Sequence, residues 1–247
     1  MPLPDQGFDV TEVAVPWRVL SDMGHQVVFA SENGAVPAGD PRLLTGVLFG
    51  KFGAEPEPRE YYARLEADLA FRAPVPWAAL RMSDYDGLVL PGGHAPGMRQ
   101  YLGSRLLRDK VAGFWQLERP VAAICHGVVV LARTPDPRTG RSVLADQLTT
   151  CLPKYMERSA FYVSAWRLGR YYRTYPEYVE DEVRAAAGSF ERGPWVLRRR
   201  GKIDDDRPAF TVRSGRYLSA RWPGDAYLFA RQFADMLEQR HGPLHAS

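Results

Sequence analysis

The chain has 247 residues, of which 45% are hydrophobic and 25% are charged. This composition is typical of a folded protein with a large core, and it excludes a disordered or fibrous chain. The 32 basic and 29 acidic residues leave a formal charge of only +3, which gives no support for nucleic-acid binding. No apolar run approaches the ~20 residues of a membrane span, and the first ten residues do not resemble a signal peptide. We therefore expect one cytoplasmic domain over residues 1–247, with neither a nucleic-acid nor a membrane partner.

Elements in the first half alternate between helix and strand. Apolar residues at helical spacing, with Thr11 as the expected N-cap, predict a helix over 12–23 that Gly24 ends. A strand should precede this helix, yet only residues 1–4 are left for it. We therefore expect a truncated first strand or a start upstream of Met1. The other elements predicted here are strands over 25–30 and 86–90 and helices over 59–71 and 104–118.

The second half continues the alternation. The predicted elements are strands over 120–124 and 147–151, a helix directly after Cys125, helices over 155–172, 178–187 and 225–240, and a β-hairpin over 209–220. Strands that alternate with helices predict an α/β fold, a three-layer sandwich with a mostly parallel central sheet. Helical insertions are expected near 55–75 and 155–188. Ligands of such sheets bind at the C-terminal ends of the strands.

The stretch 121–127 (VAAICHG) places Cys125 between a strand and a helix, with small residues at Ala123 and Gly127. This is the pattern of a nucleophile elbow that carries Cys in place of Ser. The N-terminus of the following helix should stabilise the thiolate and lower the pKa of Cys125. The backbone N–H of His126 is placed to stabilise an oxyanion. Without this context, Cys125 would be read as a small core residue.

Two further segments could serve the same site. Residues 91–94 (PGGH) end the preceding strand, and the N–H of Gly93 is a candidate second oxyanion donor, although a plain turn has the same sequence. Glu12 stands at a predicted helix N-terminus, where acidic residues usually complement the helix dipole. If its side chain faces Cys125 instead, it can move protons.

Three segments together resemble the ThiJ/PfpI superfamily, whose flavodoxin-like fold is related to class I glutamine amidotransferase domains. They are residues 7–16 (GFDVTEVAVP), 85–94 (YDGLVLPGGH) and 123–127 (AICHG), and residues 221–230 (RWPGDAYLFA) are similar to the last helix of the longer, bacterial branch. The resemblance implies that Cys125 is the nucleophile, Glu12 its hydrogen-bond partner and His126 the base, with Gly93 and His126 as oxyanion-hole amides. It also implies cofactor-independent glyoxalase, deglycase, peptidase, amidase or isonitrile hydratase activity, or a holding chaperone.

The chain departs from this family's pattern in two places. No histidine is followed two residues later by glutamate late in the chain, which argues against glutamine amidotransfer. The acid that orients the histidine in hydrolase members would align with Lys154, which cannot serve. Glu157 is nearby but on helix spacing, so it is a weaker candidate, and the third member of a triad stays unassigned. A Cys125–Glu12 pair without a third member suits addition to an aldehyde better than amide hydrolysis.

Several residues keep two interpretations. His241 and His245 could bind a metal, but a terminal tail without a third ligand is the simpler interpretation, so no metal site and no cofactor are predicted. The apolar segment 41–53 could be a lid or a dimer contact. A set of aromatic residues could line a substrate pocket or pack against a core or an oligomer face: Trp166, Tyr171, Tyr172 and Tyr175.

The predicted function is thus that of an enzyme acting on a small carbonyl or acyl compound through Cys125, with a homodimer expected from the resemblance alone. The alternative is a non-catalytic stress-response protein. In that case Cys125 would be a redox sensor oxidised to sulfinate, or the apolar 43–49 stretch would serve a holding chaperone.

Overall fold

A four-stranded sheet forms the centre of the computed structural model, which describes all residues except 51, 174, 197–199 and 242–247. The strand order is β5 (Leu88–Leu90), β6 (Val121–Ile124), β10 (Tyr217–Ala220) and β9 (Thr211–Ser214). Strands β5 and β10 pair with β6 in parallel, whereas β9 runs antiparallel to β10. Every residue of β5, β6 and β10 is buried, as expected for strands covered on both faces.

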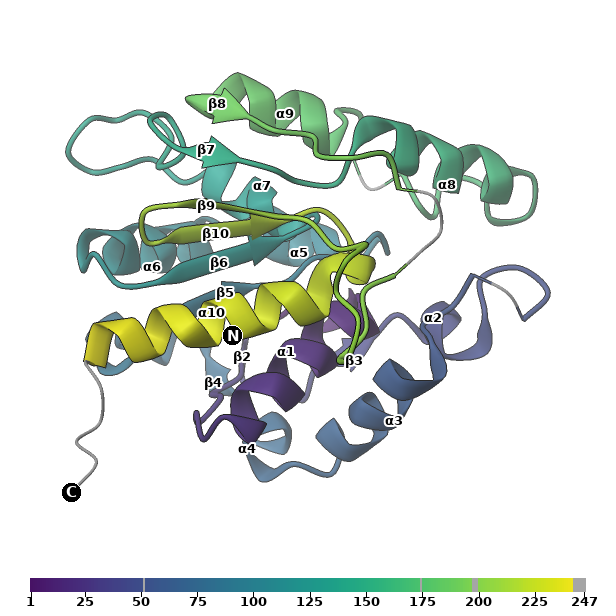
Figure 1. Cartoon of the computed structure of the whole chain (residues 1–247), viewed down its shortest axis with the longest axis horizontal. Helices are drawn as coiled ribbons and strands as arrows, with labels where there is room; N and C mark the ends of the chain where they lie inside the picture. The colour runs from purple at the N-terminus through teal and green to yellow at the C-terminus, as the bar shows by residue number, and fades with distance from the viewer. Residues whose placement is uncertain (51, 174, 197–199, 242–247) are drawn as a thin grey trace.

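Helices cover both faces of this sheet (Figure 1). On one face α10 (Ala226–His241) contacts β6 and β10 and packs along α1 (Val10–Asp22). On the other face α7 (Gly127–Ala132) contacts β5 and β6, with α5 (Met98–Gly103) and α6 (Arg105–Gln116) beside it. The predicted three-layer α/β sandwich is confirmed.

The remaining elements lie around this sandwich. Three short parallel pairs extend the strand structure: β1 (Gln6–Phe8) with β3 (Ala38–Gly39), β2 (Ala30–Ser31) with β4 (Val75–Pro76), and β7 (Leu148–Thr149) with β8 (Ser189–Phe190). The other helices are α2 (Pro41–Thr45), α3 (Pro56–Leu65), α4 (Leu69–Arg72), α8 (Lys154–Leu168) and α9 (Val179–Ala186). None of the helices in the described residues combines the length and the apolar character needed to cross a bilayer.

Four sequence predictions in the N-terminal third were wrong. The N-cap of α1 is Asp9, not Thr11, because the Asp9 carboxylate accepts the backbone N–H groups of Thr11 and Glu12. The strand ahead of α1 is β1, a segment that we had not assigned to any element. Of the strand predicted over 25–30, only Ala30 belongs to a strand. The helix predicted over 59–71 is interrupted, because α3 ends at Leu65 and Asp68 is the N-cap of α4.

Close packing of the sheet against α7 depends on Gly127. A Cβ atom at this position would lie 2.0 Å from the carbonyl oxygen of Leu90, whereas a Cβ at Gly113 in α6 would meet nothing within 4 Å. We expect Gly127→Ala to lower the free energy of unfolding by about 3 kcal/mol, because backbone must move to admit the methyl group. The control Gly113→Ala should raise it by roughly 0.5–1 kcal/mol, since alanine favours the helix. Urea unfolding measures both, and equal effects would contradict this account.

Candidate active site

Cys125 occupies a sharp turn between β6 and α7. Its φ angle is 57°, a left-handed conformation that costs about 1 kcal/mol for a residue with a side chain. His126 is the N-cap residue of α7, and Gly127 begins the helix. The strand–turn–helix geometry expected of an elbow is therefore present at Cys125, and the surrounding fold sustains its backbone strain.

Two glycines after β5 bring a second chain segment against this turn. A Cβ atom at Gly92 would lie 2.6 Å from the backbone nitrogen of His126 and 2.9 Å from Oε2 of Glu12. Gly93 has a φ angle of 157°, and a Cβ there would lie 2.9 Å from the backbone nitrogen of Asp9. Only glycine fits either position. The end of β5, the end of β6 and the start of α1 consequently meet at one point.

Glu12 enters the site from the first turn of α1 and is fully buried. Its spacing from Asp9 is that of a capping box, in which the glutamate normally bonds back to the N-cap N–H. Here Oε2 of Glu12 instead accepts the N–H of Gly92 at 2.8 Å. Burial, and then the neighbouring Asp9 carboxylate, raise the pKa of Glu12 well above its ordinary value. The raised pKa favours the protonated form of this carboxyl group, which lies beside the Cys125 thiol.

Burial also shifts the pKa values of the Cys125 thiol and the His126 imidazole. It is the main cause that raises the pKa of Cys125 well above the ordinary value, so our prediction of a lowered pKa is wrong for the closed site. Burial, and then His94, hold the pKa of His126 well below 6.5. Nδ1 of His126 lies 3.5 Å from Sγ of Cys125. A neutral imidazole thus stands next to a protonated thiol, which is the arrangement in which histidine can accept its proton.

The site is closed to solvent in this conformation. Cys125 and Glu12 have no exposed surface, and His126 is 1% exposed. The ring of Tyr172 packs edge-on against His94, with 5.8 Å between the ring centroids. The hydroxyls of Tyr171 and Tyr172 donate to the carboxylate of Asp40 at 3.0 and 3.2 Å. The tyrosine segment between α8 and α9 therefore packs over the His94 side of the site.

The sequence of residues 3–192 matches a family described as ThiJ/PfpI family-like. The match covers more than half of the chain. The protein belongs to the ThiJ/PfpI-like family.

Relatives support this ThiJ/PfpI-like assignment over nearly the whole chain. An uncharacterized protein of Schizosaccharomyces pombe is 30% identical over 245 residues, which cover 95% of this chain and 82% of the relative. A deglycase of Pyrococcus abyssi is 27% identical over 232 residues, 94% of each chain. The structure of glyoxalase III from Candida albicans superposes with a TM-score of 0.69 at 22% identity, covering 94% of this chain and 89% of the other, so it shows the shared fold.

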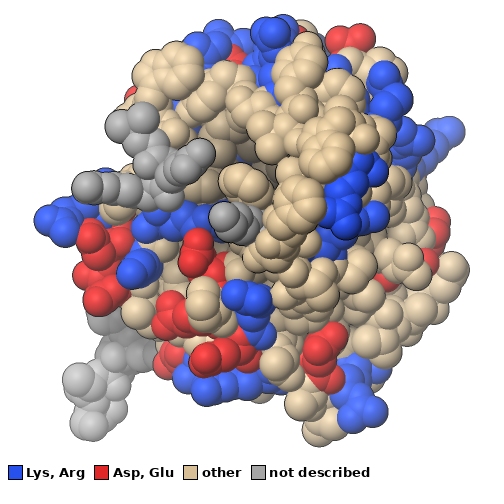
Figure 2. All heavy atoms as spheres, turned by 90° about the vertical axis from the view of Figure 1, so that its right-hand side faces the viewer, with Lys and Arg blue, Asp and Glu red and all other residues tan. Residues whose placement is uncertain are grey.

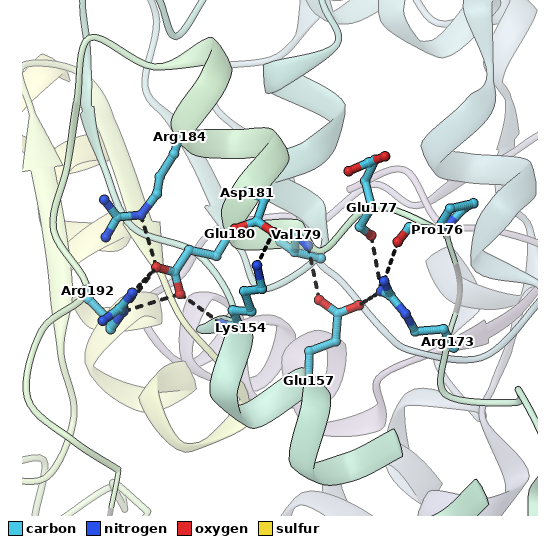
Figure 3. A network of polar contacts seen from close by, with 10 residues as sticks. All are labelled: Lys154, Glu157, Arg173, Pro176, Glu177, Val179, Glu180, Asp181, Arg184 and Arg192. Carbon is cyan, nitrogen blue, oxygen red and sulfur yellow. Dashed lines mark hydrogen bonds and ion pairs between the residues drawn. The ribbon is translucent and has the colours of Figure 1, made fainter. Parts of the chain in front are cut away.

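Among the residues that the structure describes, Cys125 and His126 of this ThiJ/PfpI-like chain have no third partner of the kind found in a hydrolytic triad. Within the described part of the chain, no carboxylate is hydrogen-bonded to the ring of His126. Glu157 pairs with Arg173 at 2.9 Å and accepts the N–H of Val179, and Lys154 pairs with Asp181 (Figure 3). Both positions considered from the sequence thus belong to the packing of α8 against α9.

The Glu157–Arg173 pair yields a stability prediction. Both side chains are buried, and Arg173 also donates to the backbone carbonyls of Pro176 and Glu177. We expect Arg173→Met to lower the free energy of unfolding by about 3–5 kcal/mol, because it leaves a buried carboxylate without its partner. Lys154→Met breaks a half-exposed pair between α8 and α9 and should cost only roughly 0–1 kcal/mol. Denaturant unfolding of the two variants measures both losses in the free energy of unfolding. A loss below about 1 kcal/mol for Arg173→Met would refute the prediction.

Asp9 makes the stability of the site depend on pH. Burial raises the pKa of Asp9 to about 6 from an ordinary value of 3.8. Its folded-state pKa lies above the unfolded value, so its stabilising contribution is complete below pH 3.8 and is lost as pH rises through 6. Asparagine can still cap α1 but carries no charge. We expect Asp9→Asn to be more stable than the natural chain by about 3 kcal/mol near pH 8, with little difference near pH 4. Urea unfolding at both pH values is the test, and a pH-independent difference would contradict it.

Some site residues escaped the sequence analysis. The sequence predicted only a turn at residues 91–94, although a histidine directly after two glycines at a strand end is a signal that could have identified His94. The role of Tyr172 was left open, and it closes the site, whereas Trp166 is 69% exposed and stacks on Phe49. His245 lies outside the described residues.

Proposed function

We propose that this protein is a cofactor-independent enzyme that uses Cys125 to act on a small carbonyl compound, with an α-oxoaldehyde such as methylglyoxal as the preferred substrate class. The observation that carries the proposal is the enclosed cluster of a thiol, an imidazole whose pKa is lowered and a carboxyl group whose pKa is raised. Such a site can add sulfur to an aldehyde and then move protons without water. The names of two similar proteins, a deglycase and a glyoxalase III, agree with carbonyl chemistry.

The first step forms a bond between Sγ of Cys125 and the aldehyde carbon. His126 takes the thiol proton and returns it to the aldehyde oxygen, which gives a hemithioacetal. The N–H groups of Gly93 and His126 would stabilise the negative charge on that oxygen as the bond forms.

The second step is an internal oxidation and reduction. His126 removes the proton from the former aldehyde carbon, while Glu12 gives its proton to the neighbouring ketone oxygen, and an enediol results. The enediol collapses when His126 returns its proton to the second carbon and Glu12 recovers one from the first oxygen. Carbon 1 is oxidised and carbon 2 is reduced, so no external oxidant is needed. Water then cleaves the thioester, which releases lactate and restores the thiol.

Amide hydrolysis fits the site less well. It needs a histidine held in one tautomer by an acid, and the described residues offer His126 no such acid. Addition to an aldehyde needs no leaving-group protonation, so it does not depend on that third residue.

Alkylation protection tests the proposal. Methylglyoxal should slow the reaction of Cys125 with iodoacetamide, as seen by peptide mass spectrometry, and lactate should accumulate. Cys151 is buried elsewhere and serves as the internal control, since its alkylation should not respond. Absence of both protection and lactate, together with inert behaviour toward other aldehydes and amides, would overturn the proposal.

A second candidate rests on a separate surface. Phe49 is 75% exposed and stacks on the exposed Trp166, and further apolar side chains are exposed nearby on α8. Uncharged side chains fill much of this face in Figure 2. A holding chaperone would use such a surface. Suppression of aggregation should then survive Cys125→Ser and be lost in Phe49→Ser with Trp166→Ser. The homodimer, the redox sensor and the cytoplasmic location stay predictions.

A further inference from the structure

We propose that His94, Cys125 and His126 together form a binding site for a thiophilic divalent metal ion, for which Zn²⁺ is the natural probe, and that this ion blocks the thiol. The three side chains each offer one ligand atom, and these atoms all lie within 4.8 Å of one another. No metal site was predicted from the sequence, because the candidates considered there were His241 and His245, which have no third ligand. The fold creates the cluster by bringing the loop after β5 against the loop after β6.

The spacing of the ligand atoms is close to that of a bound ion. Zn–S distances of about 2.3 Å and Zn–N distances of about 2.0 Å place tetrahedral ligands roughly 3.3–3.8 Å apart. Sγ of Cys125 and Nδ1 of His126 lie 3.5 Å apart, inside this range. The rings of His94 and His126 meet at an interplanar angle of 71° with 4.6 Å between their centroids. A shift of about 1 Å at His94, which follows two glycines, completes three-fold coordination.

The donor set selects the kind of ion. One thiolate and two imidazoles suit Zn²⁺, Co²⁺ or Cu²⁺, whereas Mg²⁺ and Ca²⁺ require oxygen ligands. On binding, the metal–sulfur bond forms as the thiol proton leaves for solvent, and no group changes its oxidation state. A fourth position remains for water. Oε1 of Glu12 is buried in the same site and has no partner in hydrogen-bonding geometry among the described residues, so it is available to bond to that water.

The expected consequence is reversible inhibition, which rests on the proposed function. Coordination ties up the sulfur lone pair that would attack the aldehyde, and it also occupies Nδ1 of His126. Metal binding itself does not depend on any catalytic activity, so the two ideas can fail separately.

Cobalt spectroscopy on the full chain tests the site. Addition of CoCl₂ should give a sulfur-to-cobalt charge-transfer band, and ZnCl₂ should displace the cobalt. Cys125→Ser should abolish the band, and His94→Ala should weaken Co²⁺ binding by about 100-fold, at least the loss typical of supporting residues. His94→Asn serves if the alanine variant does not fold, as judged by circular dichroism.

Two controls exclude other donors. Cys151→Ser should retain the band, and so should the chain with both His241→Ala and His245→Ala. A band that persists in Cys125→Ser, or that is unchanged in both His94 variants, would overturn the metal site. Lactate formation without any cobalt band would refute the metal site and leave the proposed enzyme intact. A cobalt band combined with no lactate formation, and with no protection of Cys125 by methylglyoxal, would refute the proposed enzyme and leave the metal site intact.

Discussion

Cys125→Ser is expected to lower the rate of lactate formation from methylglyoxal by about 10,000-fold or more, as for the loss of other covalent nucleophiles. Serine keeps the size of the side chain, but its hydroxyl is a far weaker nucleophile than a thiol. The left-handed backbone at this position suits serine no worse than cysteine, so the fold should be retained. Steady-state lactate assays with thermal unfolding as a check on folding measure the effect.

The matched control for this experiment is Cys151→Ser. Cys151 is also a buried free thiol, and burial raises its pKa as well, but it makes no contact with His126 or Glu12 among the described residues. Turnover in the control should match that of the natural chain. Comparable losses in the two variants would show that the effect is structural.

Glu12→Ala is expected to lower kcat by about 100- to 10,000-fold, the range found for general acid–base groups, with a smaller change in KM. The alanine variant loses both the proton donor and the acceptor for the N–H of Gly92. Glu12→Gln separates these two roles, because its amide oxygen can still accept from Gly92 while it cannot transfer a proton. A glutamine variant that is nearly as slow as alanine, yet as stable as the natural chain, would confirm the role in proton transfer. Full activity in the glutamine variant would contradict it.

The local parts of the site could be predicted from the sequence, because each is determined within a few residues. A short buried strand followed by Cys125, His126 and Gly127 specifies a strand–turn–helix, and the glycines at 92 and 93 specify a close backbone approach. The prediction that Glu12 lies beside this turn rested on the family resemblance. The structure then showed the hydrogen bond to Gly92 that holds Glu12 there.

Long-range features could not be predicted in the same way. Tyr172 reaches Asp40 across 132 positions of the chain, and no local pattern encodes such a contact. The pKa of Cys125 was predicted from the helix N-terminus alone. That local effect is outweighed by burial, which depends on segments from the whole chain. The first strand was missed because β1 ends only one residue before the N-cap of α1, so no loop separates the two elements.

The closure of the site by Tyr171 and Tyr172 sets an upper limit on substrate size. Both hydroxyls converge on one buried carboxylate, that of Asp40, so the tyrosine segment closes only when nothing protrudes between them. In the proposed mechanism, a three-carbon aldehyde held behind this segment would be shielded from bulk water until the thioester is cleaved. An adduct carried on the side chain of a folded protein would hold the tyrosine segment open and leave the Cys125 thiol exposed to solvent. If the proposed function holds, we therefore expect free aldehydes and macromolecular adducts to be processed with very different efficiency, because only free aldehydes allow the tyrosine segment to close.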